Sequence, residues 1–426
     1  MRDEGSAGDM LQVLEALLTA EIFNHHEQLD ANDLTPVMRV LFGVDGDAEE
    51  LKRPVTVSES GIARTFGIRD AKKLLGRNPF VKVEDFGQRF CITALDPAAK
   101  WFLSQGGEAF IRSNPVLAFF YSHHGIMDLP YEQIRRDNPP IGDSRASLDR
   151  RVADLLKEDE TLKNALDLFI ASAPQEVDQR LDELVCTKRQ EEAIAKLRVA
   201  LAHREFLRSK RIYELGKMLF VGPPGTGKTS LALALSKELH MPVLEVRLSM
   251  ITSQYLGETS KNIDRVFDFA KRISPCILFI DEFDFVAKSR ITDDHGAMKR
   301  AVNMLLKNID RTSLVRDGVL LIAATNHPQL LDEAAWRRFD DVVEFPMPDE
   351  GTRRMILEKI LQNVEHDCDL DILAVRTEGF SGADLRVMVK EGLISALSRS
   401  SGRIGMEDIQ RGLSLIQNRN RIRAGE

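Results

Sequence analysis

The sequence predicts an α/β fold in which a parallel sheet is flanked by helices. Three continuous apolar runs carry this prediction, at Met218 to Val221, Cys276 to Ile280 and Val319 to Ala324. Such runs are typical of strands that are buried on both faces, as they are in a parallel sheet covered by helices. Helical patterns dominate the chain before and after these runs. We therefore expect a mostly helical N-terminal region and a small helical domain after the sheet.

The first apolar run leads into a glycine-rich loop, and a helix-like run from Leu231 to Leu235 follows it. The glycines let successive backbone N–H groups turn toward phosphates, and the helix adds the positive end of its dipole. Lys228 is expected to reach the β and γ phosphates, and the Thr229 hydroxyl to coordinate Mg²⁺. This is the phosphate loop of a P-loop NTPase. The residues predicted to bind ATP in it are Gly222, Pro223, Pro224, Gly225, Thr226, Gly227, Lys228, Thr229 and Ser230.

Carboxylates follow the second apolar run, where Asp281 and Glu282 come directly after Ile280. The carboxyl ends of parallel strands face the ligand crevice, so both side chains should meet the nucleotide. Asp281 would hold the Mg²⁺ shell and Glu282 would act as the general base that polarises the attacking water. The third run ends in Asn326, which offers a neutral polar side chain near the γ-phosphate.

Six motifs in this order resemble the AAA ATPases, over roughly Leu181 to Gln417. Besides the motifs above, they include a segment that ends in Val185, the second region of homology at 331–340, and a lid motif at 380–385. The resemblance implies that Asn326 is sensor 1. It also implies that Val185, Ser381 and Gly382 lie close to the adenosine.

Within the second region of homology, Arg337 and Arg338 resemble the arginine fingers of this family. The resemblance implies that they project onto the γ-phosphate of a neighbouring subunit, so that an active site is complete only in a ring. We expect a homo-hexamer. The direct Arg-Arg-Phe spacing looks more like the katanin and spastin group than like members with Arg-Pro-Gly-Arg-Phe.

Tyr255, Leu256 and Gly257 resemble the pore loop that grips an extended polypeptide in the central channel. An aromatic ring on a glycine-hinged loop can pack against side chains of many sequences, which suits traction on unrelated substrates. The alternative is that Tyr255 only packs its own loop.

The composition limits the classes of protein that this chain can belong to. Its 426 residues, of which 43% are hydrophobic and 29% charged, suffice for two or three globular domains. No apolar run approaches the ~18 residues of a membrane span, and the N-terminus lacks the pattern of a secretory signal. Cys91, Cys186, Cys276 and Cys368 form no metal-binding spacing. We expect reduced thiols in a cytoplasmic protein without a membrane partner.

Charge is unevenly distributed over the N-terminal region. Residues 1–50 contain 2 basic and 12 acidic side chains, whereas residues 51–105 contain 10 basic and 5 acidic ones. Predicted helices at 59–66, 69–75 and 96–103 surround a predicted hairpin at 80–93, an order that resembles a winged-helix domain. Arg69, Lys72, Lys73 and Arg77 would lie on its recognition helix, facing DNA phosphates, although winged helices also dock proteins.

These observations predict three domains. They are an N-terminal substrate or partner region at 1–172, the large ATPase subdomain at 173–346 and the helical lid at 347–426. The first includes an amphipathic stripe from Leu148 to Phe169, expected to be helical. We expect an ATP hydrolase that acts like a chaperone and remodels or threads a protein. The alternative is a DNA-associated ATPase recruited by the winged-helix-like segment.

Overall fold

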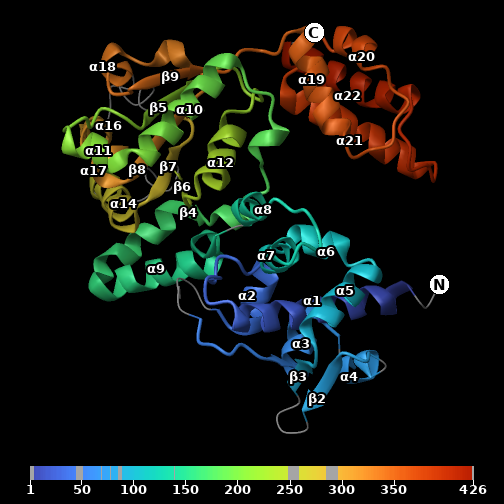
Figure 1. The fold of residues 1–426 in the computed structure, drawn as a ribbon. Helices are drawn as coiled ribbons and strands as arrows, with labels where there is room; N and C mark the ends of the chain where they lie inside the picture. The colour runs from blue at the N-terminus through green and yellow to red at the C-terminus, as the bar shows by residue number, and fades with distance from the viewer. Residues whose placement is uncertain are drawn as a thin grey trace. The chain divides into compact units, whose positions relative to one another are not determined.

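The structure, a computed structural model, forms two compact units (Figure 1). Their bounds are Met1–Arg150 and Arg151–Glu426. The residues that it describes are 4–44, 51–68, 70–76, 78–84, 89–138, 140–247, 259–284 and 296–424.

The second unit is built on a six-stranded mixed sheet. The predicted parallel sheet is confirmed for five adjacent strands, and β4 pairs antiparallel with β6 at one edge. The predicted apolar runs form β5, β7 and β8, and every residue of β7 and β8 is buried. In spatial order the strands are β4 (Phe169–Ser172), β6 (Val243–Val246), β7 (Cys276–Ile280), β8 (Val319–Thr325), β5 (Lys217–Val221) and β9 (Asp341–Glu344).

The amphipathic stripe from Leu148 to Phe169 is not one helix. Helix α9 (Arg145–Glu158) ends before Asp159, whose side chain accepts a hydrogen bond from the Thr161 N–H at 3.0 Å and begins the 3₁₀ segment η2 (Glu160–Leu168). Phe169 then starts β4, pairs with Val246 and packs its ring 4.8 Å from that of Phe269. Residues 151–172 therefore fold with the ATPase unit, whereas the sequence assigned them to the N-terminal region.

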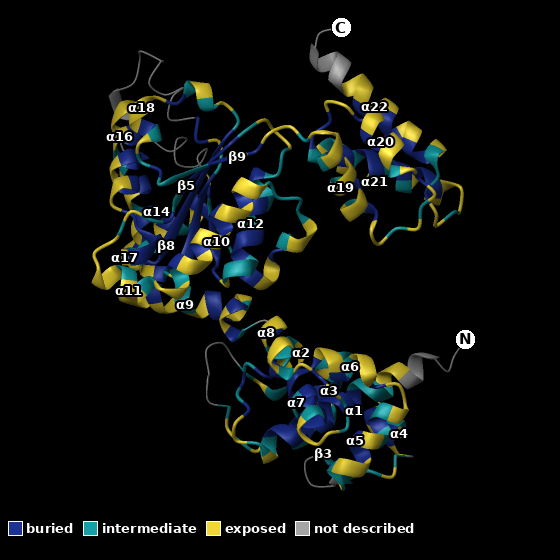
Figure 2. Cartoon of the chain, turned by 45° about the horizontal axis from the view of Figure 1, so that its top comes forward, coloured by how far each residue is buried: buried dark blue, intermediate teal, exposed yellow. Residues whose placement is uncertain are grey.

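Helices flank this sheet, and their outer faces are exposed while the strands between them are buried (Figures 1 and 2). The helix α12 follows β5 directly, so the end of that strand and the start of that helix meet at the phosphate loop. The helices that belong to this part of the unit are α10 (Lys188–Ala202), α11 (Arg204–Ser209), α12 (Lys228–Leu239), α14 (Thr259–Ile273), α16 (Gly296–Asp310), α17 (Leu314–Asp317) and α18 (Glu333–Trp336).

The predicted helical lid follows β9. Its core contains Leu357, Leu385 and Met388. The buried Arg353 guanidinium donates hydrogen bonds to the carbonyls of Ala374 and Pro348, which ties the first lid helix to the second. The lid helices are α19 (Glu350–Leu361), α20 (Leu370–Arg376), α21 (Gly382–Ser398) and α22 (Met406–Ala424).

The N-terminal unit is mostly helical and has one small antiparallel sheet, in the order β1-β3-β2. The long helix α1 runs through its core, where Val13, Leu17 and Ile22 are fully or almost fully buried. Its elements are α1 (Glu4–His25), α2 (Pro36–Phe42), β1 (Val57–Ser58), α3 (Glu59–Phe66), α4 (Ala71–Leu75), β2 (Val81–Glu84), β3 (Arg89–Ile92), α5 (Leu95–Ser104), α6 (Glu108–Ser113), α7 (Pro115–His123) and α8 (Tyr131–Asp137).

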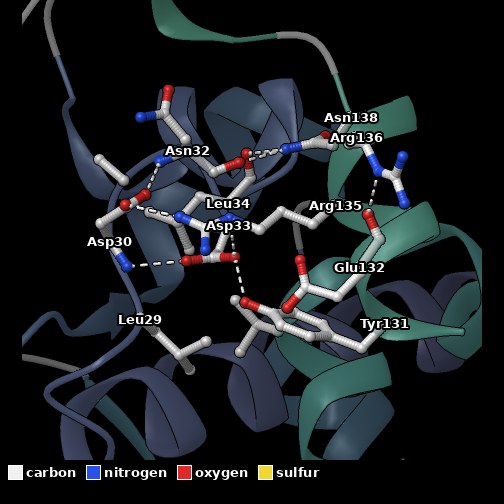
Figure 3. Close-up of polar contacts among 12 residues, drawn as sticks. Leu29, Asp30, Asn32, Asp33, Leu34, Tyr131, Glu132, Arg135, Arg136 and Asn138 are labelled. Atoms are coloured by element: carbon white, nitrogen blue, oxygen red, sulfur yellow. Dashed lines mark hydrogen bonds and ion pairs between the residues drawn. The ribbon is translucent and has the colours of Figure 1, made fainter.

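A polar network holds α8 against the loop before α2 (Figure 3). Arg135 lies 2.7 Å from the Asp30 carboxylate and 3.1 Å from that of Asp33. Tyr131 donates a hydrogen bond to Asp33 at 2.8 Å, and the Asn138 amide donates to the carbonyl of Asn32 at 2.6 Å. Asp33 is fully buried, so these charge-assisted bonds fix the position of α8.

No helix in the described parts of either unit is long and apolar enough to cross a membrane.

Candidate functional site: a nucleotide pocket between the sheet and the lid

The phosphate loop requires glycine at two positions for different reasons. Gly222 has φ +153°, and a Cβ there would lie 2.1 Å from the carbonyl oxygen of Phe345. Gly225 has φ +79°, and its Cβ would lie 2.6 Å from the Ser381 hydroxyl of the lid. Any other residue at Gly225 would therefore strain the backbone and displace the lid from the loop.

Lys228 is the first residue of α12 and points back into the loop. Its Nζ donates hydrogen bonds to the carbonyls of Gly222 and Pro223, both at 2.7 Å. The side chain is buried, and burial lowers the pKa of its ammonium, partly opposed by the nearby Asp281 carboxylate. Two carbonyls thus hold this cation at the loop.

Thr229 and Asp281 are brought together as the sequence predicts. The Thr229 hydroxyl donates a hydrogen bond to Asp281 Oδ2 at 3.0 Å, which joins the start of α12 to the end of β7. A hydroxyl and a carboxylate are hard oxygen ligands, the kind that Mg²⁺ prefers beside triphosphate oxygens. The pair therefore fits Mg²⁺, which when bound would neutralise charge on the phosphates. The described residues contain no cluster of three or more His, Cys, Asp or Glu that could hold a metal by itself.

Glu282 has a strained backbone. Its φ is +53°, in the left-handed region that non-glycine residues rarely occupy, and its N–H donates to Asp281 Oδ1 at 2.8 Å. Strain of this kind is often found at functional sites. The Glu282 side chain is exposed and, unlike Asp281, does not line the nucleotide cavity. The turn therefore directs two consecutive carboxylates to different surroundings.

A buried polar contact fixes the end of β8. Thr325 donates a hydrogen bond to Asp284 at 3.1 Å and accepts one from the His327 N–H at 3.0 Å. Asn326, between them, lines the cavity as predicted for a residue near the γ-phosphate. This contact positions Asn326, and the sequence analysis did not identify it.

These elements enclose a cavity of about 500 Å³ between the large subdomain and the lid. Its volume suits a nucleotide-sized ligand, within the ~300–1,000 Å³ common for such sites. The predicted site residues that line it are Val185, Pro224, Gly225, Thr226, Gly227, Lys228, Thr229, Ser230, Asp281, Asn326 and Gly382. Gly222 and Pro223 contribute the carbonyls that hold Lys228.

The lid closes one side of the cavity through its α21 terminus. Ser381 caps α21, with its hydroxyl accepting from the Asp384 N–H at 3.3 Å, and the Ala383 N–H donates to the Gly225 carbonyl at 3.1 Å. Ser381 thus contacts the loop without lining the cavity.

The sequence analysis missed several residues that line the cavity. Ile356 and Ile360 of α19 join Leu184 and Val185 in an apolar wall that suits a flat aromatic base. Arg386 of α21 adds a cation, and Gln190 of α10 a neutral amide. The i, i+4 spacing of the two isoleucines marks one helix face, but nothing in the sequence indicates which subdomain that face meets.

Arg337 and Arg338 lie outside this cavity. The Arg337 side chain is 72% exposed and pairs with Glu333 one helical turn earlier. Arg338 donates to the Leu306 carbonyl at 3.3 Å and to Asp310 at 3.2 Å. Neither guanidinium lines its own chain's nucleotide pocket.

The proposed pore loop, Tyr255, Leu256 and Gly257, lies outside the described residues. The same is true of Arg69 and Arg77 on the predicted recognition helix, whereas Lys72 and Lys73 are exposed on α4.

The cavity, its phosphate loop and the Thr229–Asp281 pair at the end of a buried strand define a P-loop nucleoside triphosphatase. Residues 218–347 match the AAA family, described as the ATPase family associated with various cellular activities, and residues 367–411 match the AAA+ lid domain. The chain is similar to an uncharacterized AAA family ATPase of Sinorhizobium fredii, with 37% identity over 52% of this chain and 67% of that one. This chain belongs to the AAA family and is an ATP hydrolase.

Two further relatives are matched over less than two thirds of their own length. A protein of Methanothermobacter marburgensis, named as a homolog of a 26S proteasome regulatory subunit, is 35% identical over 53% of this chain and 61% of its own length. An ATP-dependent zinc metalloprotease FtsH of a Thermoanaerobacter species is 36% identical over 50% of this chain and 37% of its own length. The crystal structure of the FIGL-1 AAA domain has the same fold, with TM-score 0.50 and 23% identity over 61% of this chain and 91% of that one.

Proposed function

We propose that this ATPase assembles as a ring, a homo-hexamer, and uses ATP hydrolysis to remodel or thread a protein substrate. The observation that carries the proposal is the position of Arg337, a largely exposed guanidinium that does not line its own chain's nucleotide pocket. An arginine that stabilises transition-state charge from a neighbouring subunit must be presented in this way. The Arg-Arg-Phe spacing, similar to the katanin and spastin group, supports the same role.

In this proposal one subunit binds the nucleotide, and the next subunit completes the active site. Lys228 binds the β and γ phosphates and Asn326 contacts the γ-phosphate. Thr229 and Asp281 hold Mg²⁺, and Glu282 takes the proton from the attacking water. Arg337 and Arg338 of the adjacent subunit meet the charge that develops on the transferred phosphoryl group.

Threading predicts that Tyr255→Ala leaves ATP hydrolysis largely intact but uncouples it from unfolding, because this side chain would grip substrate and not nucleotide. Substrates can be recovered by co-purification with a Glu282→Gln variant and labelled with a fluorophore. Their ATP-dependent unfolding is then measured with chains that retain Glu282. Ser253→Ala, in the same segment, is the control and should unfold substrate at the parental rate. Parental unfolding by Tyr255→Ala would instead make Tyr255 a packing residue of its own loop.

The second candidate function is DNA association through the N-terminal unit, and the order of its elements favours it. A helix, a strand, two helices and a two-stranded hairpin follow one another as α1, β1, α3, α4, β2 and β3, with α2 inserted. This is the order of a winged helix, in which α4 would be the recognition helix. Lys72 and Lys73 are exposed on α4 and could contact phosphates.

If α4 faces duplex DNA, neutralising each phosphate contact should lower the salt dependence of binding. We expect Lys72→Gln and Lys73→Gln each to lower the slope of log K against log salt concentration by about one. The measurement is titration of the full chain against random duplex at several salt concentrations. Lys390→Gln, an exposed charge on the lid, should leave the slope unchanged. A folded chain that binds no duplex at low salt would leave the winged-helix-like segment as a protein-docking module.

A further inference from the structure

The N-terminal unit contains a cavity of about 730 Å³ that the ATPase site does not use. Five helices, α1, α2, α3, α6 and α8, contribute its lining. The volume is too large for an inorganic ion alone and falls within the ~300–1,000 Å³ of sites that hold organic ligands. Its apolar lining residues are Pro36, Val37, Met38, Phe66, Phe110 and Ile134.

Glu15 brings a buried carboxylate to this apolar cavity. Glu15 is only 9% exposed, and the Asn114 amide donates a hydrogen bond to the Glu15 Oε1 at 2.8 Å. Among the described residues, no lysine, arginine or histidine forms an ion pair with Glu15. Burial raises the pKa of Glu15 to about 7, with the Asn114 hydrogen bond opposing part of the rise. A buried acid without a cation is costly, so a cationic ligand would be favoured here.

The other charges of the lining also favour a cation. Arg112 is already paired with Glu108 at 2.8 Å, whereas Asp137 adds a second carboxylate to the cavity wall. Among the described residues, the Asp137 side chain accepts a hydrogen bond from the neutral Gln133 side chain at 3.0 Å. The cavity therefore presents two carboxylates, and its one lining guanidinium is engaged by Glu108 outside the lining.

The Thr65 hydroxyl is a further polar group that faces the cavity lining. Thr65, on α3, lines the cavity, and its buried hydroxyl has no hydrogen-bond partner among the described residues. Buried hydroxyls are nearly always hydrogen-bonded, so this one marks a place where a ligand group would improve the structure. It is independent of the carboxylates, because it belongs to a different helix.

The mouth and the wall of the cavity suit an extended chain. Val37 lines the cavity and is 46% exposed, and Val40, one turn later on α2, is 59% exposed. This pair offers apolar surface that continues beyond the cavity. Another wall, α8, is held in place by the Arg135, Tyr131 and Asn138 contacts (Figure 3). The site is thus formed before any ligand binds, which lowers the entropic cost of binding.

We propose that this cavity binds a short peptide segment in which a lysine or arginine stands beside apolar residues, with the cation paired to Glu15. The occupant would be part of a protein delivered to the ATPase, so the physiological role rests on the proposed remodelling function. Binding itself needs neither ATP nor a ring, and it can therefore fail or succeed independently of that function.

The test uses the full chain without nucleotide and a fluorescein-labelled peptide, Gly-Ser-Leu-Lys-Phe-Ser-Gly, titrated by fluorescence anisotropy at pH 7.5. A matched peptide carries Glu in place of Lys. We expect the Lys peptide to bind about 10-fold or more tightly than the Glu peptide, and Glu15→Gln to remove that preference. Glu21→Gln, on the same helix but outside the cavity, should retain it. Val37→Lys, an exposed substitution at the mouth, should also weaken the Lys peptide.

The pH dependence adds a readout that a packing role for Glu15 would not produce. Only ionised Glu15 pairs with a cation, so affinity for the Lys peptide should rise several-fold from pH 6 to pH 8 and stay level in Glu15→Gln. The other charged lining residues are Arg112 and Asp137. Unaltered ATP hydrolysis and a cooperative thermal transition will establish that the variants are folded.

Three outcomes would overturn the proposal. One is equal affinity of the parent chain and Glu15→Gln for the Lys peptide. Another is the absence of saturable binding up to about 1 mM peptide, an affinity too weak for a specific site. The third is displacement of the Lys peptide by n-butylamine at equal molar concentration, which would make the site one for small amines.

Discussion

Glu282→Gln should bind ATP as tightly as the parent chain and hydrolyse it at least about 10²-fold more slowly, the usual contribution of a general base. Lys228→Ala should instead lose ATP binding, because it removes the cation that the loop holds at the carbonyls of Gly222 and Pro223. The two carboxylates at the end of β7 are thus expected to have different roles, Asp281 in binding Mg²⁺ and Glu282 in activating water. Asp281 bonds to Thr229 within the cavity, whereas the left-handed turn places Glu282 outside that pair.

Nucleotide affinity and steady-state hydrolysis, measured on the same preparations, distinguish these variants. Glu344→Gln is a matched control, since Glu344, like Glu282, is an exposed glutamate at the carboxyl end of a strand of this sheet, but its strand β9 is separated from β7 by β8 and β5. It should bind and hydrolyse ATP like the parent chain. Hydrolysis by Glu282→Gln at the parental rate would remove Glu282 from the mechanism.

The central strands could be predicted because a strand that is buried on both faces requires a continuous run of apolar residues. Every residue of β7 and β8 is buried, and both strands are continuous apolar runs. The edge strand β4 has no such continuously buried run. Its four residues have mixed exposure, and they follow a 3₁₀ segment whose apolar spacing continues that of α9. The stripe therefore indicated a helix where the chain adds a strand.

The phosphate site was predictable for a different reason. Its chemistry depends on a few residue types at fixed spacing, and the loop, Thr229 and Asp281 meet as that spacing implies. The apolar wall from Ile356 and Ile360 depends on how the lid packs against the large subdomain. No local pattern encodes that packing, and the same applies to the buried Thr325–Asp284 contact beneath Asn326.

Subunits that lack Arg337 and Arg338 should regain ATPase activity when they are mixed with Glu282→Gln subunits. Each parent should be slower than the unmodified chain, for the arginine variant by about 10³-fold. In a mixed ring, a subunit with an intact Glu282 can receive arginines from a Glu282→Gln neighbour, and that interface then contains both parts. The measurement is hydrolysis against mixing ratio, which should pass through a maximum.

The two arginines should not contribute equally. Arg338 bonds to Leu306 and Asp310 of α16 within its own chain, so its replacement also disturbs packing, whereas Arg337 contacts only Glu333 among the described residues. Arg337→Ala is therefore the cleaner test, and Glu333→Gln, which frees Arg337 without removing it, should retain activity. Because a trans arginine needs a neighbour, the specific activity of the unmodified chain should fall on dilution as the ring dissociates. Equal activity per subunit in dilute monomer and in the ring, together with no gain on mixing, would place both arginines in structural roles.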